Sequence, residues 1–230
     1  MTIAGAVESF DVEIPINGGK GRSAVLPGRL GLPAPPTGLV VFAHGSGSSR
    51  HSPRNEAVAA VLHESWIGTL LFDLLTPQEA TDRVNVFDIG LLAERLAAAI
   101  RFVAGLQQTR HLAIGLFGAS TGAAAALVAA ALEPRVKAVV SRGGRPDLAG
   151  RRLRAVRAPT LLVVGGAGTE VLDLNRRALA EIAADEKQLA VIPGATHLFE
   201  EPGTLDEAAR LAAEWFARHL HAETEREGAR

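Results

Sequence analysis

The segment 118–122 reads Gly-Ala-Ser-Thr-Gly, the G-x-S-x-G pattern in which the central serine is a nucleophile. An apolar run at 111–117 precedes it, and an alanine-rich run at 123–132 follows it. These flanks predict a strand, a sharp turn and a helix, which is the setting of a nucleophile elbow. Glycines on both sides let the backbone pass close to its neighbours while the turn exposes the hydroxyl of Ser120. We therefore predict that Ser120 is a catalytic nucleophile.

A histidine stands where a general base would be needed. His197 lies in a glycine-containing loop, Pro-Gly-Ala-Thr-His-Leu-Phe at 193–199, directly after the last predicted strand. In that place it could take the proton of Ser120 and later hand it to the leaving group. The remaining histidines fall within or beside predicted elements or in a polar loop, so His197 is the candidate base.

A glycine- and serine-rich loop, His-Gly-Ser-Gly-Ser-Ser at 44–49, follows another predicted strand. Its backbone N–H groups suit an oxyanion hole, with Ser46 as one donor, Thr121 as the second and Gly45 close to the substrate. A phosphate-binding loop is an alternative, although Arg50 stands where a dinucleotide fingerprint needs glycine. A plain tight turn is the third interpretation.

The carboxylate that should orient the histidine is harder to place. We expect it in the turn after the strand at 160–164, but residues 165–168 read Gly-Gly-Ala-Gly. Glu170 is the nearest acid, with Asp147 and Asp173 as alternatives and the absence of an acid as a further one. A glutamate in the first turn of a helix is also explained by the helix dipole alone.

Two arginines, Arg142 and Arg145, lie in the polar segment Ser-Arg-Gly-Gly-Arg-Pro-Asp at 141–147. They could contact an anionic substrate at the rim of the site. The alternative is a solvated loop in which one of them pairs with Asp147.

These side chains need a framework, and the apolar patterning predicts one. Strands are expected at 9–16, 22–27, 38–43, 68–73, 111–117, 136–140, 160–164 and 188–192, and helices at 55–65, 87–106, 123–132, 171–184 and 205–220. From residue 38 onward strands and helices alternate, which predicts a mostly parallel sheet covered on both faces. The first two strands, joined by Asn-Gly-Gly at 17–19, should form an antiparallel hairpin at one edge. We expect one α/β domain over residues 1–221, a frayed tail at 222–230, and an open site without a cap domain.

The composition narrows the function. A net charge of −1 gives no reason to expect nucleic acid or an anionic membrane surface as partner. The chain has no cysteine, which excludes disulfides and thiolate chemistry. The first residues lack the pattern of a signal peptide, and no apolar stretch is long enough for a membrane span, so a cytoplasmic location is expected. The predicted chemistry needs no metal or organic cofactor, and either a monomer or a homodimer is compatible with the sequence.

Taken together, the segments at 44–49, 118–122, 141–150, 161–166 and 195–200 make the chain resemble the α/β-hydrolase superfamily, in particular its small lidless members of the dienelactone hydrolase type. The resemblance spans residues 10–220 and implies an eight-stranded, mostly parallel sheet with a Ser-acid-His triad. Two positions depart from it. Dienelactone hydrolases proper use a cysteine nucleophile where this chain has Ser120, and relatives usually carry aspartate where this chain has Gly168.

The sequence therefore predicts a serine hydrolase that cleaves small carboxylic esters through an acyl-enzyme on Ser120. A thioesterase, a lactonase or an acyltransferase would use the same intermediate. A non-catalytic binding protein that keeps the pocket is the alternative from another class.

Overall fold

The computed structural model describes residues 6–18 and 22–220. Eight strands form one sheet in the order β1-β2-β4-β3-β5-β6-β7-β8. The strands are β1 (Glu8–Gly18), β2 (Arg22–Leu32), β3 (Gly38–Ala43), β4 (Ile67–Phe72), β5 (Ile114–Ala119), β6 (Val136–Arg142), β7 (Thr160–Gly165) and β8 (Lys187–Ile192). All pairs from β4 to β8 are parallel, whereas β1 and β2 are antiparallel at one edge. The predicted fold class is confirmed.

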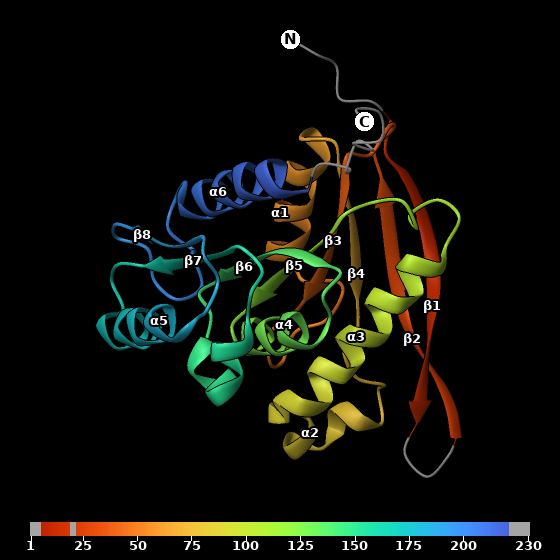
Figure 1. The fold of residues 1–230 in the computed structure, drawn as a ribbon, viewed down its shortest axis with the longest axis horizontal. Helices are drawn as coiled ribbons and strands as arrows, with labels where there is room; N and C mark the ends of the chain where they lie inside the picture. Colours follow the sequence, from red (N-terminus) through yellow and green to blue (C-terminus); the bar gives the residue numbers. More distant parts are fainter. Residues whose placement is uncertain (1–5, 19–21, 221–230) are drawn as a thin grey trace, which may run out of the picture.

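Helices cover both faces of this sheet (Figure 1). They are α1 (Pro53–Glu64), α2 (Arg83–Phe87), α3 (Ile89–Gly105), α4 (Thr121–Leu132), α5 (Thr169–Glu181) and α6 (Thr204–His219), with 3₁₀ turns η2 (Glu79–Thr81) and η3 (Pro146–Ala155). One apolar cluster joins α1 and α6 to one face of the strands, and a second joins α3, α4 and α5 to the other. Between β6 and β7 the chain forms only η3, so no cap domain stands there.

The central strands are apolar on both sides because both faces of the sheet are covered. Every residue of β3, β4, β5 and β7 is buried. This is the pattern of a parallel sheet between two helical layers, and it explains the continuous apolar runs of the sequence. Among the described helices, none is both long enough and apolar enough to cross a membrane.

The N-terminal hairpin is longer than predicted. β2 continues past Pro27 to Leu32, and its second half, Gly28–Gly31, pairs with β4. The prediction that Asn17 and Gly18 form the turn was wrong, because both pair in the β1–β2 ladder. The connection falls on residues 19–21, outside the described residues, as does the predicted tail at 222–230.

The helix predicted at 87–106 is confirmed as α3, which begins two residues later and ends one residue earlier than predicted. α2 ends at Phe87, and α3 begins at Ile89 with Asp88 between them. The side chain of Asp88 accepts a hydrogen bond from the amide of Leu91 at 3.0 Å and so caps α3. The apolar spacing runs across this boundary and could not reveal it.

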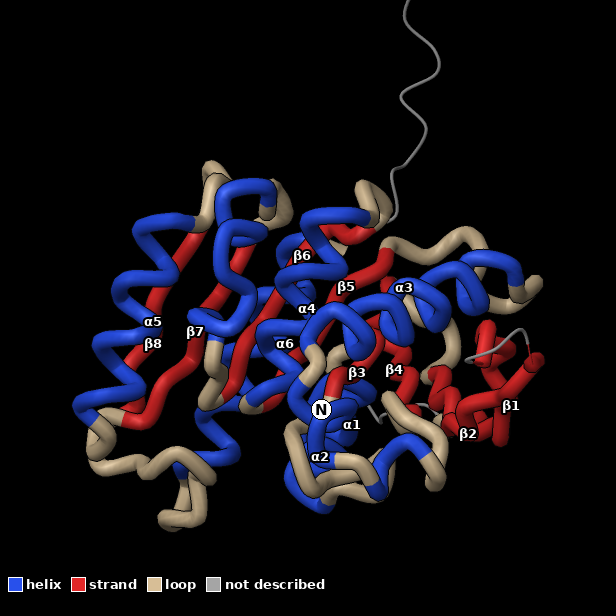
Figure 2. The backbone as a smooth tube through the Cα atoms, turned by 90° about the horizontal axis from the view of Figure 1, so that it is seen from below, coloured by secondary structure: helices blue, strands red, loops and turns tan. Residues whose placement is uncertain are grey.

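The order of the strands creates the site. β3 lies between β4 and β5, so the chain leaves β3 toward one edge and returns on its other side (Figure 2). The loops after β3 and β5 therefore diverge and leave a crevice at their carboxyl ends, where ligands bind in open α/β sheets.

Candidate active site

Ser120 occupies a strained turn between β5 and α4. Its backbone has φ 52° and ψ −121°, a conformation that a residue with a side chain rarely adopts. Its amide donates to the carbonyl of Arg142 at 3.3 Å, and its carbonyl accepts from the amide of Arg145 at 3.1 Å. The surrounding chain thus holds Ser120 in the geometry of a nucleophile elbow.

Gly122 shows why the pattern requires a small residue two positions later. A Cβ at position 122 would lie 2.2 Å from the carbonyl oxygen of Ala43 and 2.5 Å from that of His44. The first turn of α4 therefore packs directly on the backbone that leaves β3. This contact brings the elbow and the loop at 44–49 together.

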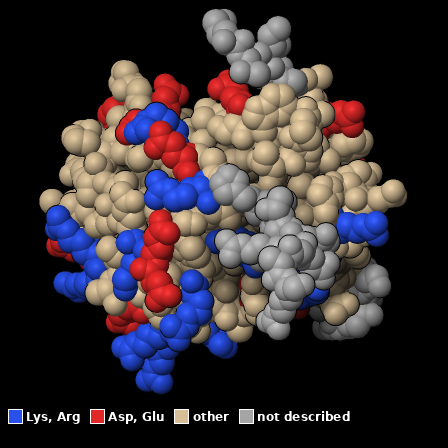
Figure 3. Space-filling view, turned by 45° about the horizontal axis from the view of Figure 1, so that its top comes forward, with Lys and Arg blue, Asp and Glu red and all other residues tan. Residues whose placement is uncertain are grey.

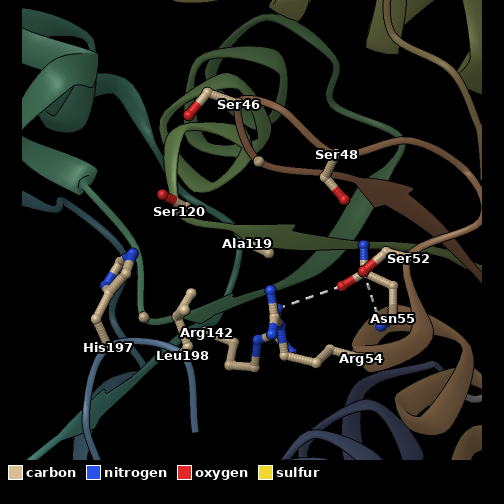
Figure 4. A pocket seen from close by; sticks show the side chains of 12 residues that line it. Ser46, Ser48, Ser52, Arg54, Asn55, Ala119, Ser120, Arg142, His197 and Leu198 are labelled. Carbon is tan, nitrogen blue, oxygen red and sulfur yellow. Dashed lines mark hydrogen bonds between the residues drawn. The ribbon is translucent and has the colours of Figure 1, made fainter. Parts of the chain in front are cut away.

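A cavity of about 230 Å³ opens above the elbow (Figure 4). It is lined by five of the predicted site residues, namely Gly45, Ser46, Ser120, Arg142 and His197. Thr121 instead lines a smaller cavity of about 100 Å³ on the other side of Ser46. Arg145 does not line the larger cavity.

The loop at 44–49 is held by its own histidine. The amide of Leu74 donates to Nε2 of His44 at 3.1 Å, so the proton of the neutral ring is on Nδ1, which lies 3.0 Å from the carbonyl oxygen of Gly45. Burial lowers the pKa of His44, which favours this neutral form. Sequence reasoning placed this histidine in the loop but did not recognise that it positions the loop.

The two predicted oxyanion donors are neighbours. The amide of Ser46 donates to Oγ1 of Thr121 at 2.9 Å. The Ser46 amide, one of the two proposed oxyanion donors, is therefore bound to the hydroxyl of Thr121. Thr121, whose amide is the second proposed donor, is the first residue of α4.

His197 lies on the same side of the cavity as Ser120 in Figure 4, while Ser48 and Ser52 lie on the far side. Its Nδ1 is buried and has no hydrogen-bond partner in the part of the chain that the structure describes. Burial, followed by the positive charges of Arg142, Arg145 and Arg54, lowers the pKa of His197. A neutral imidazole suits a general base, but no carboxylate of the described part of the chain is hydrogen-bonded to its Nδ1.

The three candidate acids have other positions. Asp147 accepts two hydrogen bonds from Arg145, at 2.9 and 2.8 Å, which confirms the alternative of a paired loop. Asp173 pairs with Arg176 on the exposed face of α5 at 3.0 Å. Glu170 lies in the first turn of α5. None of them is hydrogen-bonded to Nδ1 of His197, which has no partner among the described residues.

Gly168 precedes α5 and faces open space. A Cβ built at this position meets no heavy atom within 4 Å. The adjacent amide of Ala167 donates to the carbonyl of Ala195 at 3.0 Å, so the turn after β7 touches the loop that carries His197. The place for an orienting acid is therefore present without the acid.

Sequence reasoning missed the polar residues that α1 contributes. Ser52, Arg54 and Asn55 line the larger cavity, together with Ser48. The signal was available, since Ser52 precedes Pro53 and caps α1 by accepting from the amide of Asn55 at 3.3 Å. What the sequence did not reveal is that this helix begins at the cavity.

The central strands, the elbow after β5 and the histidine after β8 define the α/β-hydrolase fold. The model of the dienelactone hydrolase family matches residues 75–221, and the chain belongs to that family. A dienelactone hydrolase from Anabaena variabilis ATCC 29413 is 50% identical, with a TM-score of 0.88 over 94% of this chain and 99% of that one. Est1E from Butyrivibrio proteoclasticus, at 16% identity, shares the fold with a TM-score of 0.71 over 90% of this chain and 99% of its own.

Among curated proteins, a protein of Mycobacterium tuberculosis named "Putative phosphoribosyl transferase" is 62% identical over 195 residues. The match covers 84% of this chain but 44% of that relative. The chain thus corresponds to less than half the length of the curated relatives it matches. The family and the structural neighbours together support a hydrolase.

Proposed function

We propose that this protein is a serine hydrolase that cleaves carboxylic esters through an acyl-enzyme on Ser120. The observation that carries the proposal is the conformation of Ser120, with φ 52° at the start of α4 and its side chain in the same cavity as His197. Backbone strain of this kind persists only where the surroundings enforce it, and it often marks a functional residue.

In the proposed reaction, His197 removes the proton of Ser120 as the hydroxyl oxygen attacks the ester carbonyl. The tetrahedral oxyanion is stabilised by the amides of Ser46 and Thr121, which requires the Ser46 amide to leave Oγ1 of Thr121. His197 then protonates the leaving alcohol. Water, deprotonated by His197, attacks the acyl-enzyme and releases the acid.

The unpartnered Nδ1 of His197 favours a second candidate, a binding protein that keeps the hydrolase cavity without turnover. Loss of the orienting carboxylate costs about 10⁴ in kcat in triad enzymes. A slow hydrolase and an inactive scaffold are therefore the two functions to separate. A thioesterase, a lactonase and an acyltransferase share the acyl-enzyme and differ only in the substrate or the acceptor.

The test is hydrolysis of p-nitrophenyl acetate and butyrate by the wild type, Ser120→Ala, His197→Ala, Glu170→Gln and Asp147→Asn. We expect activity to disappear in the first two variants and to persist in both acid variants, because neither acid contacts His197. A fluorophosphonate probe should label the wild type and not Ser120→Ala. A wild type that is neither labelled nor faster than Ser120→Ala would favour the scaffold.

The transferase name belongs to relatives in which this chain matches less than half the length. We propose that any phosphoribosyl transfer resides in the remainder of those proteins. A cytoplasmic location, and a small ester as the partner in place of nucleic acid or membrane, stay predictions.

A further inference from the structure

Arg142 is a buried cation that has no acidic partner within residues 6–18 and 22–220. Arg142 is the last residue of β6 and is 7% exposed. Its Nη1 has no hydrogen-bond partner among the described residues. Its Nη2 donates to Oδ1 of Asn55 over a long 3.4 Å, and the guanidinium lies 5.9 Å from the ring centroid of Phe117. Buried charges normally have paired acceptors, so this side chain is incompletely satisfied by the protein alone.

Surface arginines in the same molecule behave differently. On the face shown in Figure 3, basic and acidic side chains are interspersed. Arg210, for example, contacts Glu207 at 2.7 Å, and Arg218 contacts Glu186 at 3.3 Å. Arg142 therefore stands out because it is both buried and without a carboxylate.

A second arginine lines the same cavity. Arg54 comes from the first turn of α1 and forms an ion pair with the exposed side chain of Glu200 at 3.5 Å. Burial, and then the charge of Arg54, lowers the pKa of Arg142 to about 10, which leaves Arg142 charged at neutral pH. Two like charges that face one cavity repel each other unless an anion lies there.

The remaining wall of the cavity also attracts anions. Ser52 caps α1, whose N-terminus carries a partial positive charge, and the hydroxyls of Ser48 and Ser52 line the cavity with Asn55. In Figure 4 the two arginines lie beside Ser52 and Asn55, whereas Ser120 and His197 lie on the other side of the cavity. Cations, hydroxyls and a helix N-terminus thus converge.

We propose that this end of the cavity binds a phosphate group of the substrate, so that the ester cleaved at Ser120 carries a phosphomonoester on its acyl or alcohol part. Two guanidinium groups match the charge of a phosphate dianion, and donors on several sides suit its tetrahedral shape better than a flat carboxylate. The part of the proposal that concerns an ester substrate rests on the proposed function, whereas the binding of phosphate at this site does not depend on it.

The smaller cavity, which is lined by Ser46 and Ser48 as the larger one is, complements this site. Leu74, Leu75, Val86 and Leu92 line it, and its volume is about 100 Å³. The substrate would place its charged group by α1 and a short apolar group there.

The test is calorimetric titration of inorganic phosphate, at pH 8 and fixed ionic strength, into Ser120→Ala. Because this variant lacks the nucleophile, binding is measured whether or not the protein hydrolyses esters. We expect saturable binding that weakens at least tenfold in Arg54→Ala and in Arg142→Gln, each combined with Ser120→Ala. The matched control is Arg176→Gln, which removes one exposed arginine on α5 and should leave the affinity unchanged.

Acetate is titrated in parallel to separate phosphate from carboxylate. Acetate that binds as tightly as phosphate would overturn the phosphate assignment. Phosphate that does not bind, or binds equally in Arg54→Ala and the control, would overturn the site. Arg54 is 40% exposed in its side chain, so its removal tests the proposal even if Arg142→Gln does not fold.

Discussion

The amide nitrogen of Ser46 donates a hydrogen bond to Oγ1 of Thr121 across 2.9 Å. Ser46 lies in the loop after β3, and Thr121 is the first residue of α4 after β5, on the two sides of the switch point of the sheet. In the proposed reaction both amides serve the oxyanion, so the threonine hydroxyl competes with the substrate for Ser46.

This relationship predicts the effect of Thr121→Ala. The variant keeps the amide of residue 121 and frees the amide of Ser46, so we expect kcat for p-nitrophenyl acetate to equal or exceed that of the wild type by a few fold. Thr121→Ser, which keeps the hydroxyl, is the control and should resemble the wild type. A fall of 10²-fold or more in Thr121→Ala, the size expected for loss of an oxyanion donor, would contradict this role of the hydroxyl.

Gly168→Asp should make the site faster. The position is open, and its turn touches the loop of His197, so a carboxylate there could accept a hydrogen bond from Nδ1. We expect kcat to rise at least tenfold, since the orienting acid is worth about 10⁴ in triad enzymes. Gly168→Asn has the same size without the charge. Equal rates in the aspartate and asparagine variants would show that the acid does not reach His197.

The pH profile should reflect the cationic surroundings of His197. Because burial and then three arginines lower its pKa, the base stays neutral below the usual 6.5. We expect the acidic limb of kcat/KM to have its midpoint below pH 6.5, and to move upward in Arg54→Ala, which removes one of the charges. Arg176→Gln should not move it. A midpoint above 6.5 in the wild type would contradict the prediction.

Stability should fall as the pH drops below about 6.5. The pKa values of His44, His63 and His197 are all lowered, in each case chiefly by burial. The unfolded chain then binds more protons than the folded one below 6.5, while above that value the contribution is fully present. Below pH 6.5 each histidine lowers the free energy of unfolding by at most about 1.4 kcal/mol per pH unit, and by less where it is partly exposed.

Urea unfolding at pH 7.5 and pH 5.5 measures this effect. The lower pH should give the lower free energy of unfolding, and His63→Gln, which lies outside the cavity, should reduce the difference. Equal free energies at the two pH values would show that these histidines are not buried in their neutral form.

Gly122→Ala should destabilise the protein strongly. The added Cβ would lie 2.2 Å from a backbone oxygen of β3, which cannot move away as a flexible side chain would. We expect a loss of about 3 kcal/mol or more, in the range of severe overpacking. Gly168→Ala, with nothing near its Cβ, is the control; it replaces the glycine N-cap of α5 and should cost no more than about 1 kcal/mol. Thermal unfolding of the two variants side by side makes the comparison.

The sequence predicted the local features well and the distant ones poorly. The elbow at Ser120 and the order of strands and helices follow from short-range patterns, and the eight-stranded sheet confirms them. The extension of β2 to Leu32 depends on pairing with β4, some forty residues away, which no local pattern encodes. The burial of Arg142 and the approach of α1 to the cavity also arise only when the helical layer closes on the sheet.

The acid that should orient His197 was predicted poorly for a different reason. The sequence offered three carboxylates, but in the structure Asp147 and Asp173 each pair with an arginine. Charge at a given distance along the chain does not reveal which neighbour will neutralise it. The local sequence likewise did not reveal the partner of the Ser46 amide, which was expected to be free but donates to Thr121.

The empty space beside Gly168 bears on how easily a mutation could supply the missing acid. A change of the middle base turns every glycine codon into a codon for aspartate or glutamate, so a single base change would place a carboxylate at position 168. Because no atom would have to move aside, such a mutant would not need a second, compensating change. A library of random mutants selected for faster ester cleavage would therefore be expected to return to this position early.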